Sequence, residues 1–555
     1  MIYPVPRIHP AGDAAALVEV GDEISEEAHD RVRGLDVALA SARSSARMGG
    51  GTSGIVETIP AYASLLVQYD PAVLTFGELA SELLELSETA RAVPRPDARL
   101  HEIPVAYGGE YGPDLDDVAA AHRLAPEHII ALHSDAIYTV YMLGFAPGFA
   151  YMGTVPEAIA TPRLETPRVE VPAGSVGIAG QQTGIYPQAS PGGWRILGRT
   201  GVSLFSPHRE PPALLQAGDS VRFVPTSAGA AGVTEDAMRQ PSLSPVSGGT
   251  VEVLSPGALA TIQDLGRPGY QHAGVPVSGA MDPFALRAGN LLVGNQPSDA
   301  CVEVTLAGAA FRFWEDAVIA LTGADLGCVA HTPDLPNWDI PLWTPCYLRP
   351  GSWIEFRRPV WGCRAYLSIA GGITVAPVMG SRATYLRGGF GGYAGRALRA
   401  GDQLPVGPAR GDAYMLIGHE PEKPLLLPPY APNPTVRIVL GPHADRFADD
   451  SVSALLTESY AMSPQSDRMG LRLRGPALKR RVGGEMLSAG TTLGAIQVPP
   501  DGQPIVLMAD RQTAGGYPVI ATVVQDDIAL LAQCVPGEAT VKFQAVPATR
   551  TPDRR

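Results

Sequence analysis

Ala217-Gly-Asp-Ser-Val-Arg-Phe-Val-Pro225 is the stretch that decides the fold, because related stretches recur twice further along the chain. Ala400-Gly-Asp-Gln-Leu-Pro405 and Pro536-Gly-Glu-Ala-Thr-Val-Lys-Phe543 have the same order of residues, a turn with glycine and an acidic residue followed by alternating apolar and polar positions. Such alternation is typical of a strand with one buried face. Because it ends three segments of the chain, we expect three barrel-like units, each closed by the same kind of strand.

The rest of the chain consists mostly of short apolar runs between proline and glycine turns. Helical spacing is confined to residues 25–42, 75–92, 114–133 and 283–293. Strands and helices do not alternate regularly, which argues against a doubly wound parallel sheet. The sequence therefore predicts a mainly β fold with an α+β N-terminal domain and multiple β-barrels.

Five units are expected along the 555 residues. They are a small α+β domain at residues 1–95, a β-barrel at 96–225, a linker at 226–249, a β-barrel at 250–430 and a β-barrel at 431–548. The linker is identified by its serine, proline and small residues, which show no apolar periodicity.

Composition excludes several classes of protein. The formal net charge of −14 provides no basic surface of the kind that nucleic acids require. The five cysteines have no Cys-x-x-Cys spacing, so neither a zinc site nor a disulfide framework is expected, and no other resident metal is indicated. No apolar run is long enough to cross a membrane and no leader pattern is present, so the sequence predicts a cytoplasmic enzyme.

Standard catalytic motifs are also missing. The sequence contains no Gly-Lys pair and therefore no phosphate-binding P-loop, and it has neither a Gly-x-Ser-x-Gly elbow nor a His-Glu-x-x-His zinc motif. The glycines of residues 388–395 do not join a strand to a helix, so they do not indicate a dinucleotide fold. Any site must be built from the polar clusters that lie in glycine and proline turns.

Two clusters in the first half of the chain have the residue types of a substrate pocket. Glycines there let the backbone approach a ligand, aromatic rings can wall a small pocket, and uncharged amides and hydroxyls suit an amide or carboxylate ligand. The alternative is a folded-back turn with aromatic core residues. The candidate substrate-binding residues are His133, Tyr141, Gly144, Phe145, Pro147, Gly148, Tyr151, Gln181, Gln182 and Thr183.

Two clusters in the second half contain carboxylates and arginines. An arginine can clamp a substrate carboxylate while a nearby aspartate acts as general base. The candidate catalytic residues are Asp264, Arg267, Asp282, Asp467, Arg468, Asp510 and Arg511, with Gln503, Thr513 and Tyr517 as further substrate-binding candidates.

Simpler explanations exist for three of these residues. Asp264 and Arg267 could form a structural ion pair, and Asp282 precedes Pro283 at the start of a helix, as an N-cap would. Asp510 and Arg511 are expected at the rim of a site. Alanine at either position should then abolish turnover and leave the melting temperature within a few degrees.

The motifs resemble those of a known family over nearly the whole chain. Residues 12–225, with Gly144-Phe-Ala-Pro-Gly-Phe-Ala-Tyr151, resemble the B subunit of bacterial 5-oxoprolinase, the Kip inhibitor or allophanate hydrolase subunit 1 family. Residues 251–546, with Gln263-Asp-Leu-Gly-Arg-Pro-Gly269 and Ser466-Asp-Arg-Met-Gly470, resemble the C subunit, the Kip antagonist or biotin-dependent carboxyltransferase family. The linker then joins two subunits that are normally separate.

The resemblance implies cyclophilin-like β-barrels and ATP-dependent opening of 5-oxo-L-proline to L-glutamate together with a separate 5-oxoprolinase A subunit of the LamB/YcsF type. This chain would supply the substrate-activating part, with ATP and transient Mg²⁺, at a site between its two halves. Arg267, Arg468 and Arg511 would supply cations, and Asp264, Asp467 and Asp510 would act as base or Mg²⁺ ligands. A homo-oligomer is expected, without membrane or nucleic-acid partners.

Two alternatives to this activity remain open. One is the carboxyltransferase component of a urea carboxylase or allophanate-type system; because this chain lacks a biotinyl Met-Lys-Met sequence, it would need biotin on another protein. The other is a non-catalytic regulator of a kinase.

Overall fold

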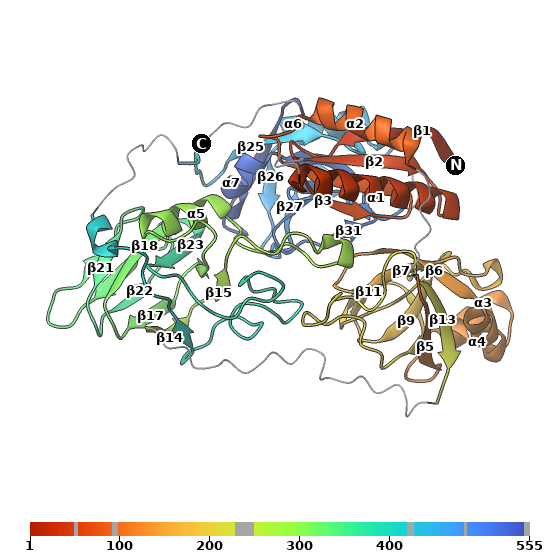
Figure 1. Ribbon diagram of the computed structural model, residues 1–555, viewed down its shortest axis with the longest axis horizontal. Coiled ribbons are helices and arrows are strands. Elements are labelled where there is room, and N and C mark those ends of the chain that lie inside the picture. Colours follow the sequence, from red (N-terminus) through yellow and green to blue (C-terminus); the bar gives the residue numbers. More distant parts are fainter. Residues whose placement is uncertain (49–53, 91–97, 228–248, 419–426, 482–485, 549–555) are drawn as a thin grey trace.

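The computed structural model describes residues 1–48, 54–90, 98–227, 249–418, 427–481 and 486–548. In Figure 1 the N-terminal domain lies beside the C-terminal barrel at the top, with the first barrel below on the right and the middle unit below on the left. Within these residues no helix is long and apolar enough to span a membrane. The expected linker at 226–249 lies almost wholly outside them.

The N-terminal domain is an antiparallel sheet covered by two helices. Its strands, in the order β1-β2-β4-β3, are β1 (Ile2–Pro10), β2 (Ala15–Gly21), β4 (Ser64–Tyr69) and β3 (Ile55–Pro60), and its helices are α1 (Glu26–Met48) and α2 (Phe76–Thr89). α1 buries Ala28, Val32, Leu35 and Leu39 against the sheet, at helical spacing. Thr75 caps α2 in a reciprocal capping box with Glu78.

The first barrel closes seven strands in the cyclic order β10-β7-β6-β13-β5-β12-β9. These are β5 (Leu100–Tyr107), β6 (Ile137–Leu143), β7 (Ala150–Gly153), β9 (Ser175–Ala179), β10 (Gln182–Ile185), β12 (Arg195–Arg199) and β13 (Ser220–Pro225). The barrel closes because β13 pairs in parallel with β5 and antiparallel with β6. α3 (Leu115–His122), α4 (Pro126–Asp135), η1 (Glu157–Ile159) and the small pair β8 (Arg168–Val171) and β11 (Ser190–Gly192) decorate it.

The C-terminal barrel repeats this topology. Its strands are β25 (Thr435–Leu440), β26 (Tyr460–Met462), β27 (Gly470–Arg474), β29 (Ala495–Gln497), β30 (Ile505–Leu507), β32 (Val519–Val523) and β33 (Thr540–Ala545), with η7 (Ala444–Arg446), α6 (Asp449–Thr457), η8 (Gln525–Asp527) and α7 (Ile528–Ala532). Their cyclic order, β30-β27-β26-β33-β25-β32-β29, matches the first barrel strand for strand, and β33 again pairs in parallel with β25. Two of the three predicted barrels are therefore present.

The prediction of a third barrel at residues 250–430 was wrong. One sheet has the order β20-β19-β22-β17-β14-β24, with β14 (Thr250–Pro256), β17 (Ala309–Phe313), β19 (Cys328–His331), β20 (Trp338–Asp339), β22 (Trp353–Phe356) and β24 (Gln403–Pro405). The other has the order β15-β16-β23-β18-β21, with β15 (Leu259–Gln263), β16 (Cys301–Thr305), β18 (Ala317–Asp325), β21 (Cys346–Leu348) and β23 (Trp361–Ile369).

The physical reason lies in the strand after the recurring turn. β24 has three residues and pairs only with β14, antiparallel, so it forms a sheet edge instead of closing a ring. The two sheets share one apolar core that includes Val253, Phe311, Leu321 and Phe356. α5 (Pro283–Leu292) packs on β18 and β23, and η5 (Ala413–Leu416) follows β24.

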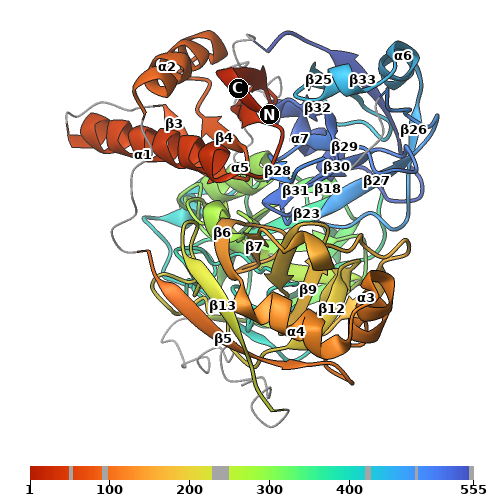
Figure 2. The ribbon, with the colours of Figure 1, turned by 90° about the vertical axis from the view of Figure 1, so that its right-hand side faces the viewer.

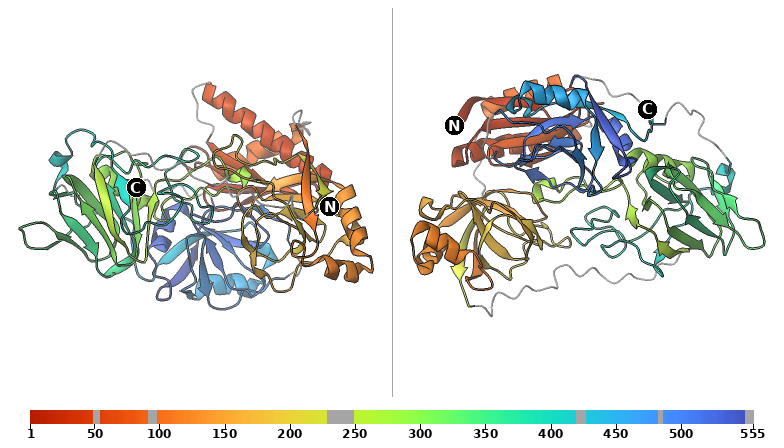
Figure 3. Two further views of the ribbon diagram at one scale, coloured as in Figure 1. Left: turned by 90° about the horizontal axis from the view of Figure 1, so that it is seen from below. Right: turned by 180° about the vertical axis from the view of Figure 1, so that it is seen from behind.

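Loops bring the units together, and Figures 2 and 3 show the units from three further sides. Tyr385 and Phe390 of the middle unit lie in the same apolar core as the first barrel, and Phe390 is 5.7 Å from Phe205 between ring centroids. η4 (Gln271–Ala273) packs on β3, and β28 (Ala489–Gly490) with β31 (Ala514–Gly515) forms a pair that packs on β4. These loops form the junction between the two halves.

Candidate active site

The turn between β6 and β7 lies against two segments of the second half. A Cβ atom on Gly144 would lie 2.5 Å from the Cβ of Ala514, so only glycine permits this approach. The N–H of Gly148 donates to the carbonyl of Ala273 at 3.0 Å, and Phe145 has a positive φ of 65°. Gly144, Phe145, Pro147 and Gly148 therefore lie where the halves meet.

An aromatic cluster continues from this turn. Tyr62, Tyr141, Phe149, Tyr151, Tyr186 and Trp194 share a core with Ala514. The ring centroids of Phe149 and Tyr151 are 4.8 Å apart, and burial raises the pKa of Tyr151 to about 12. Tyr62 donates its hydroxyl proton to Oε1 of Gln182 at 3.1 Å. Tyr141 and Tyr151 are thus packed core residues, which agrees with the alternative of a folded-back turn with aromatic core residues. Gln181, in contrast, is exposed.

His133 lies inside the first barrel, away from the junction. Its ring stacks on Phe223 at 4.7 Å, Nδ1 contacts the Tyr107 hydroxyl at 2.8 Å, and Nε2 contacts Thr183 Oγ1 at 3.1 Å. Burial lowers the pKa of His133 to about 3. The structure therefore places both His133 and Thr183 in a hydrogen-bonded core.

Asp264 and Arg267 have separate partners and do not form the structural ion pair that was the simpler alternative to a catalytic role. The Asp264 carboxylate accepts from the Gly266 N–H at 2.7 Å, the Ser381 hydroxyl at 2.7 Å and the Arg382 N–H at 2.6 Å. Arg267 donates to the carbonyl of Ala383 and lies 5.1 Å above the Phe390 ring. Both side chains hold the loop of the middle unit that caps the first barrel.

Arg267 is buried with two donors unused. Neither Nε nor Nη1 has a hydrogen-bond partner among the described residues. Burial lowers its pKa, partly offset by Asp264 and Asp510.

Asp282 is the N-cap of α5. Its carboxylate accepts from the Ala285 N–H at 3.0 Å, the Gln533 amide at 2.9 Å and the Tyr430 hydroxyl at 2.9 Å. Burial raises the pKa of Asp282 to about 6. These contacts match the N-cap interpretation and give Asp282 a structural role.

Arg468 and Asp510 form a buried ion pair. Arg468 Nε and Nη2 donate to the two Asp510 oxygens at 2.9 and 3.1 Å, Nη1 donates to Glu303 at 2.6 Å, and Nη2 also donates to the carbonyl of Gly279 at 2.6 Å. Although burial opposes it, the charges of Asp510 and Glu303 raise the pKa of Arg468. The expected rim position was wrong, since Asp510 and Arg511 are each only 4% exposed.

Three other candidates serve turns or line a small cavity. Asp467 accepts from the N–H groups of Met469 and Gly470, Gln503 accepts from the Gly475 N–H at 3.0 Å, and Tyr517 is partly exposed. Among the described residues, no hydrogen bond or ion pair joins the side chains of these three to Arg468 or Asp510.

A hydrogen-bonded chain joins the two halves through Glu57, Gln271 and Arg511. Glu57 on β3 accepts from the N–H groups of Gly269 and Gln271 at 2.9 and 2.7 Å and from the Gln271 side chain at 2.7 Å. Gln271 Oε1 accepts from Arg511 Nη2 at 2.8 Å. Burial lowers the pKa of Arg511 to about 10, an effect that the charge of Glu57 opposes.

Sequence reasoning missed Glu57, Gln271 and Glu303. The available signal was the strand pattern, because Ile55-Val-Glu-Thr-Ile-Pro60 and Cys301-Val-Glu-Val-Thr305 each place one carboxylate in an otherwise apolar or hydroxyl-bearing strand. A buried carboxylate needs a partner, so each such residue indicates a contact with another element.

A cleft of about 700 Å³ opens beside Glu57. α1 and β3 form one wall, the loop of residues 211–217 and Leu143 from the first barrel form another, and Gly269, His272 and Ala273 of the second half complete it. Arg33, Asp36, Arg43, Glu57 and His272 supply its charged or titratable groups. This volume is within the usual range of small-molecule sites, roughly 300 to 1,000 Å³.

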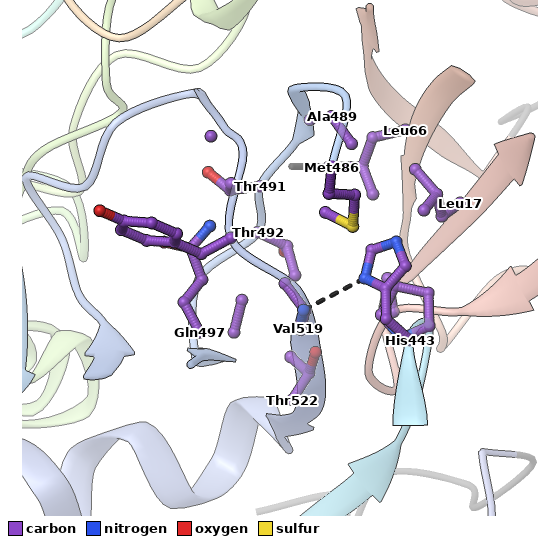
Figure 4. Close-up of a pocket in the computed structure, with 16 residues that line it drawn as sticks. Leu17, Leu66, His443, Met486, Ala489, Thr491, Thr492, Gln497, Val519 and Thr522 are labelled. Atoms are coloured by element: carbon purple, nitrogen blue, oxygen red, sulfur yellow. Dashed lines mark hydrogen bonds between the residues drawn. The ribbon is translucent and has the colours of Figure 1, made fainter. Parts of the chain in front are cut away.

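A second cavity between the N-terminal sheet and the C-terminal barrel is too small for a substrate. Figure 4 shows its lining, in which Leu17 and Leu66 face His443, Thr491 and Val519, and the Val519 N–H donates to His443 Nδ1 at 3.1 Å. The cavity measures about 10 Å³, room for roughly one water molecule. Tyr517 lines this cavity and not the large cleft.

The large cleft has the volume of a small-molecule site, and its two arginines and its histidine, beside the carboxylates of Asp36 and Glu57, can contact an anionic group of a ligand. A metal ion held by protein groups fits less well. Both oxygens of Asp264 and of Asp510 already accept hydrogen bonds, and the described residues contain no group of three or more His, Cys, Asp or Glu that could hold a metal.

Comparison with known proteins assigns the two halves to two carboxyltransferase-domain families. Residues 273–545 match the family model described as carboxyltransferase domain, subdomain A and B, and residues 6–215 match that of subdomain C and D. The chain is 40% identical over 291 residues to the C subunit of 5-oxoprolinase from Escherichia coli, a match that covers 52% of this chain and 89% of that protein. It is 42% identical over 232 residues to the B subunit of 5-oxoprolinase from Bacillus subtilis, a match that covers 39% of this chain and 92% of that protein.

A solved structure resembles the whole chain. The crystal structure of TTHA0988 is 35% identical, has a TM-score of 0.81, and covers 96% of this chain and 99% of that chain.

Proposed function

Because the chain belongs to the family of the B and C subunits of 5-oxoprolinase and joins both in one polypeptide, we propose that it helps to open 5-oxo-L-proline to L-glutamate with ATP. In this proposal a separate A subunit of 5-oxoprolinase is the partner, and the present chain supplies the part that activates the substrate. Mg²⁺ would arrive with the nucleotide phosphates, which are its usual ligands.

The observation that carries the proposal is the cleft shared by the two halves. Glu57 of the first half contacts Gly269 and Gln271 of the second half, and residues of both halves line the adjoining cleft. Neither half alone contains this lining. Joining the halves in one chain keeps both parts of the site at high effective concentration.

The lining suits activation of a small cyclic amide. Arg33, Arg43 and His272 can attract a carboxylate or phosphate, while Leu143 and Leu215 offer apolar surface to a ring. Exclusion of water by such walls strengthens interactions with charge that develops during the reaction.

The direct test is release of glutamate and ADP from 5-oxoproline and MgATP by the purified chain, alone and with a homologue of the 5-oxoprolinase A subunit. We expect activity only in the mixture. If an A subunit that is active with its own B and C partners yields no glutamate with this chain, the proposal is overturned.

Carboxyl transfer is the second candidate, because the matching family models are described as carboxyltransferase domains. This activity would require carboxybiotin on another protein, since the three lysines of this chain are in no biotinyl setting. Transfer of labelled carboxylate from a carboxylated biotin carrier to urea or a related amide would favour it.

A further inference from the structure

The cleft at the junction contains two carboxylates, Glu57 and Asp36, which differ in the number of hydrogen bonds that they accept. Glu57 already accepts three hydrogen bonds from Gly269 and Gln271. Asp36 of α1 accepts one from the Thr58 hydroxyl, at 2.6 Å to Oδ1, and no other described residue donates to its carboxylate. Asp36 is therefore the carboxylate that can still accept a hydrogen bond from a ligand.

The sequence of α1 places Asp36 on the cleft side of the helix. Ala28, Val32, Leu35 and Leu39 face the sheet, whereas Arg33, Asp36, Val37, Ala40 and Arg43 line the cleft. This second set also follows the three- and four-residue spacing of one helix face. The first set packs α1 against the sheet, whereas the charged and small residues of the second set border the cleft.

The surroundings of Asp36 make it a better proton acceptor than a carboxylate in water. Burial raises its pKa, while the Thr58 hydroxyl and the charges of His272 and Arg43 oppose this shift. Partial desolvation strengthens a hydrogen bond to the ionised oxygen, and a pKa closer to neutrality favours proton transfer. The groups that face Asp36 come from α1, β3 and the loop of η4, so both halves set its chemistry.

We propose that Asp36 accepts the N–H of a small cyclic amide bound in this cleft and takes its proton when the amide is activated; the inference rests on the function proposed above. The amide oxygen bonds to the terminal phosphorus of a nucleoside triphosphate as the bond from that phosphorus to the diphosphate breaks. The N–H electron pair becomes the second C–N bond, and the proton goes to Asp36. Thr58 is a positioning residue that holds the carboxylate.

Binding of two ligands to the full chain tests the inference without reference to turnover. Isothermal titration compares 5-oxo-L-proline with its N-methyl analogue, which lacks the N–H. The wild-type chain should bind the N-methyl analogue roughly 10- to 100-fold more weakly, the usual effect of losing a hydrogen bond to a charged group. In Asp36→Ala the two ligands should bind within about two-fold of each other.

Thr58 and an exposed glutamate provide the matched variants. Thr58→Ser keeps the hydroxyl and should retain discrimination, Thr58→Val should reduce it, and Glu85→Gln on the exposed side of α2 should behave as wild type. Valine has a methyl group where threonine has its hydroxyl, so Thr58→Val removes the hydrogen bond without leaving a cavity. If Asp36→Ala does not fold, the two Thr58 variants decide the question.

The outcomes separate this inference from the proposed function. Wild-type binding and turnover of 5-oxoproline with full discrimination retained in Asp36→Ala, or in Thr58→Val where Asp36→Ala is unfolded, would overturn the role of Asp36 alone. Failure of the wild-type chain to bind 5-oxoproline, with or without a nucleotide, would overturn both.

Discussion

Three buried arginines of the second half contact other residues of the protein, but only Arg468 has carboxylate partners. Arg468 meets Asp510, Glu303 and the carbonyl of Gly279, so its donors are used within the protein. Arg511 is shared with Gln271, and Arg267 with the carbonyl of Ala383. These contacts favour a structural role for the ion pair of Arg468 and Asp510.

Asp510→Ala should therefore destabilise the fold. Removing one partner of a buried pair typically costs about 3 to 5 kcal/mol, because Arg468 would keep a buried charge with only Glu303 opposite it. We expect the melting temperature to fall by roughly 5 to 20 °C in thermal unfolding. Asp467→Ala, in an exposed turn, is the control and should change it by much less; equal melting curves for wild type and Asp510→Ala would contradict the structural role.

His29 is a buried histidine whose ring nitrogens make no hydrogen bond to the described residues. It lies 5.1 Å from the Tyr141 ring. Burial, with help from Arg33, lowers its pKa to about 4. Because the unfolded residue has a pKa near 6.5, the native state binds fewer protons and loses stability as the pH falls from about 6.5 toward 4.

His29→Phe should remove this acid sensitivity. Between pH 7 and pH 5 the wild-type chain should lose about 2 kcal/mol more unfolding free energy than the variant, which follows from about 1.4 kcal/mol per pH unit below 6.5. Urea unfolding at the two pH values measures the difference, with exposed His208→Gln as control. A variant with the same acid loss as wild type would show that His29 is not a buried neutral histidine.

At the scale of elements, local patterns predicted the helices and strands better than their assembly. The helical spacing at residues 25–42 and 75–92 corresponds to α1 and α2, and the pattern at 283–293 corresponds to α5. The single helix expected at 114–133 is two, since Arg123 adopts a left-handed conformation and Pro126 begins the next helix.

Barrel closure could not be predicted from the recurring turn. The strands after it have the same alternation, but β13 and β33 have six residues and find a parallel partner, whereas β24 has three and finds only an antiparallel one. Likewise the turn residues of the candidate site were found from their glycines, but Asp36 and Glu57 lie in ordinary helix and strand patterns. Only tertiary contact reveals that these two carboxylates face the second half.

The turn between β6 and β7 should be sensitive to a single methyl group. Gly144→Ala would place its Cβ 2.5 Å from that of Ala514, and such overpacking typically costs about 1 to 3 kcal/mol. Ala514→Gly should restore much of the loss in the double variant, which a double-mutant cycle of thermal stability measures. Additive losses from the two substitutions would mean that the turn and β31 do not pack as described.

For the whole molecule, the repeated barrel topology explains why one chain can hold a site between its halves. The β6–β7 turn of the first barrel meets the loop between β30 and β32 of the second, so equivalent barrels present different rim loops to one junction. The N-terminal sheet and the middle unit add Glu57 and His272 to the same region. The cleft therefore forms only where the two halves are associated.

Residues 1–227 and 249–555, expressed as two chains, should consequently bind each other and together restore the activity proposed for the intact protein with the 5-oxoprolinase A subunit. Relatives of each half exist as separate subunits, and the buried contacts of Glu57 with Gly269 and Gln271 supply specificity across the interface.

Glu57→Ala should weaken association of the two chains roughly 30-fold or more, because it leaves buried N–H donors unpaired. Isothermal titration of the two chains measures this constant, with exposed Glu85→Gln as control. Tight association unchanged by Glu57→Ala would show that apolar packing around Ala514 and Phe390, and not the hydrogen-bonded chain, determines how the halves join.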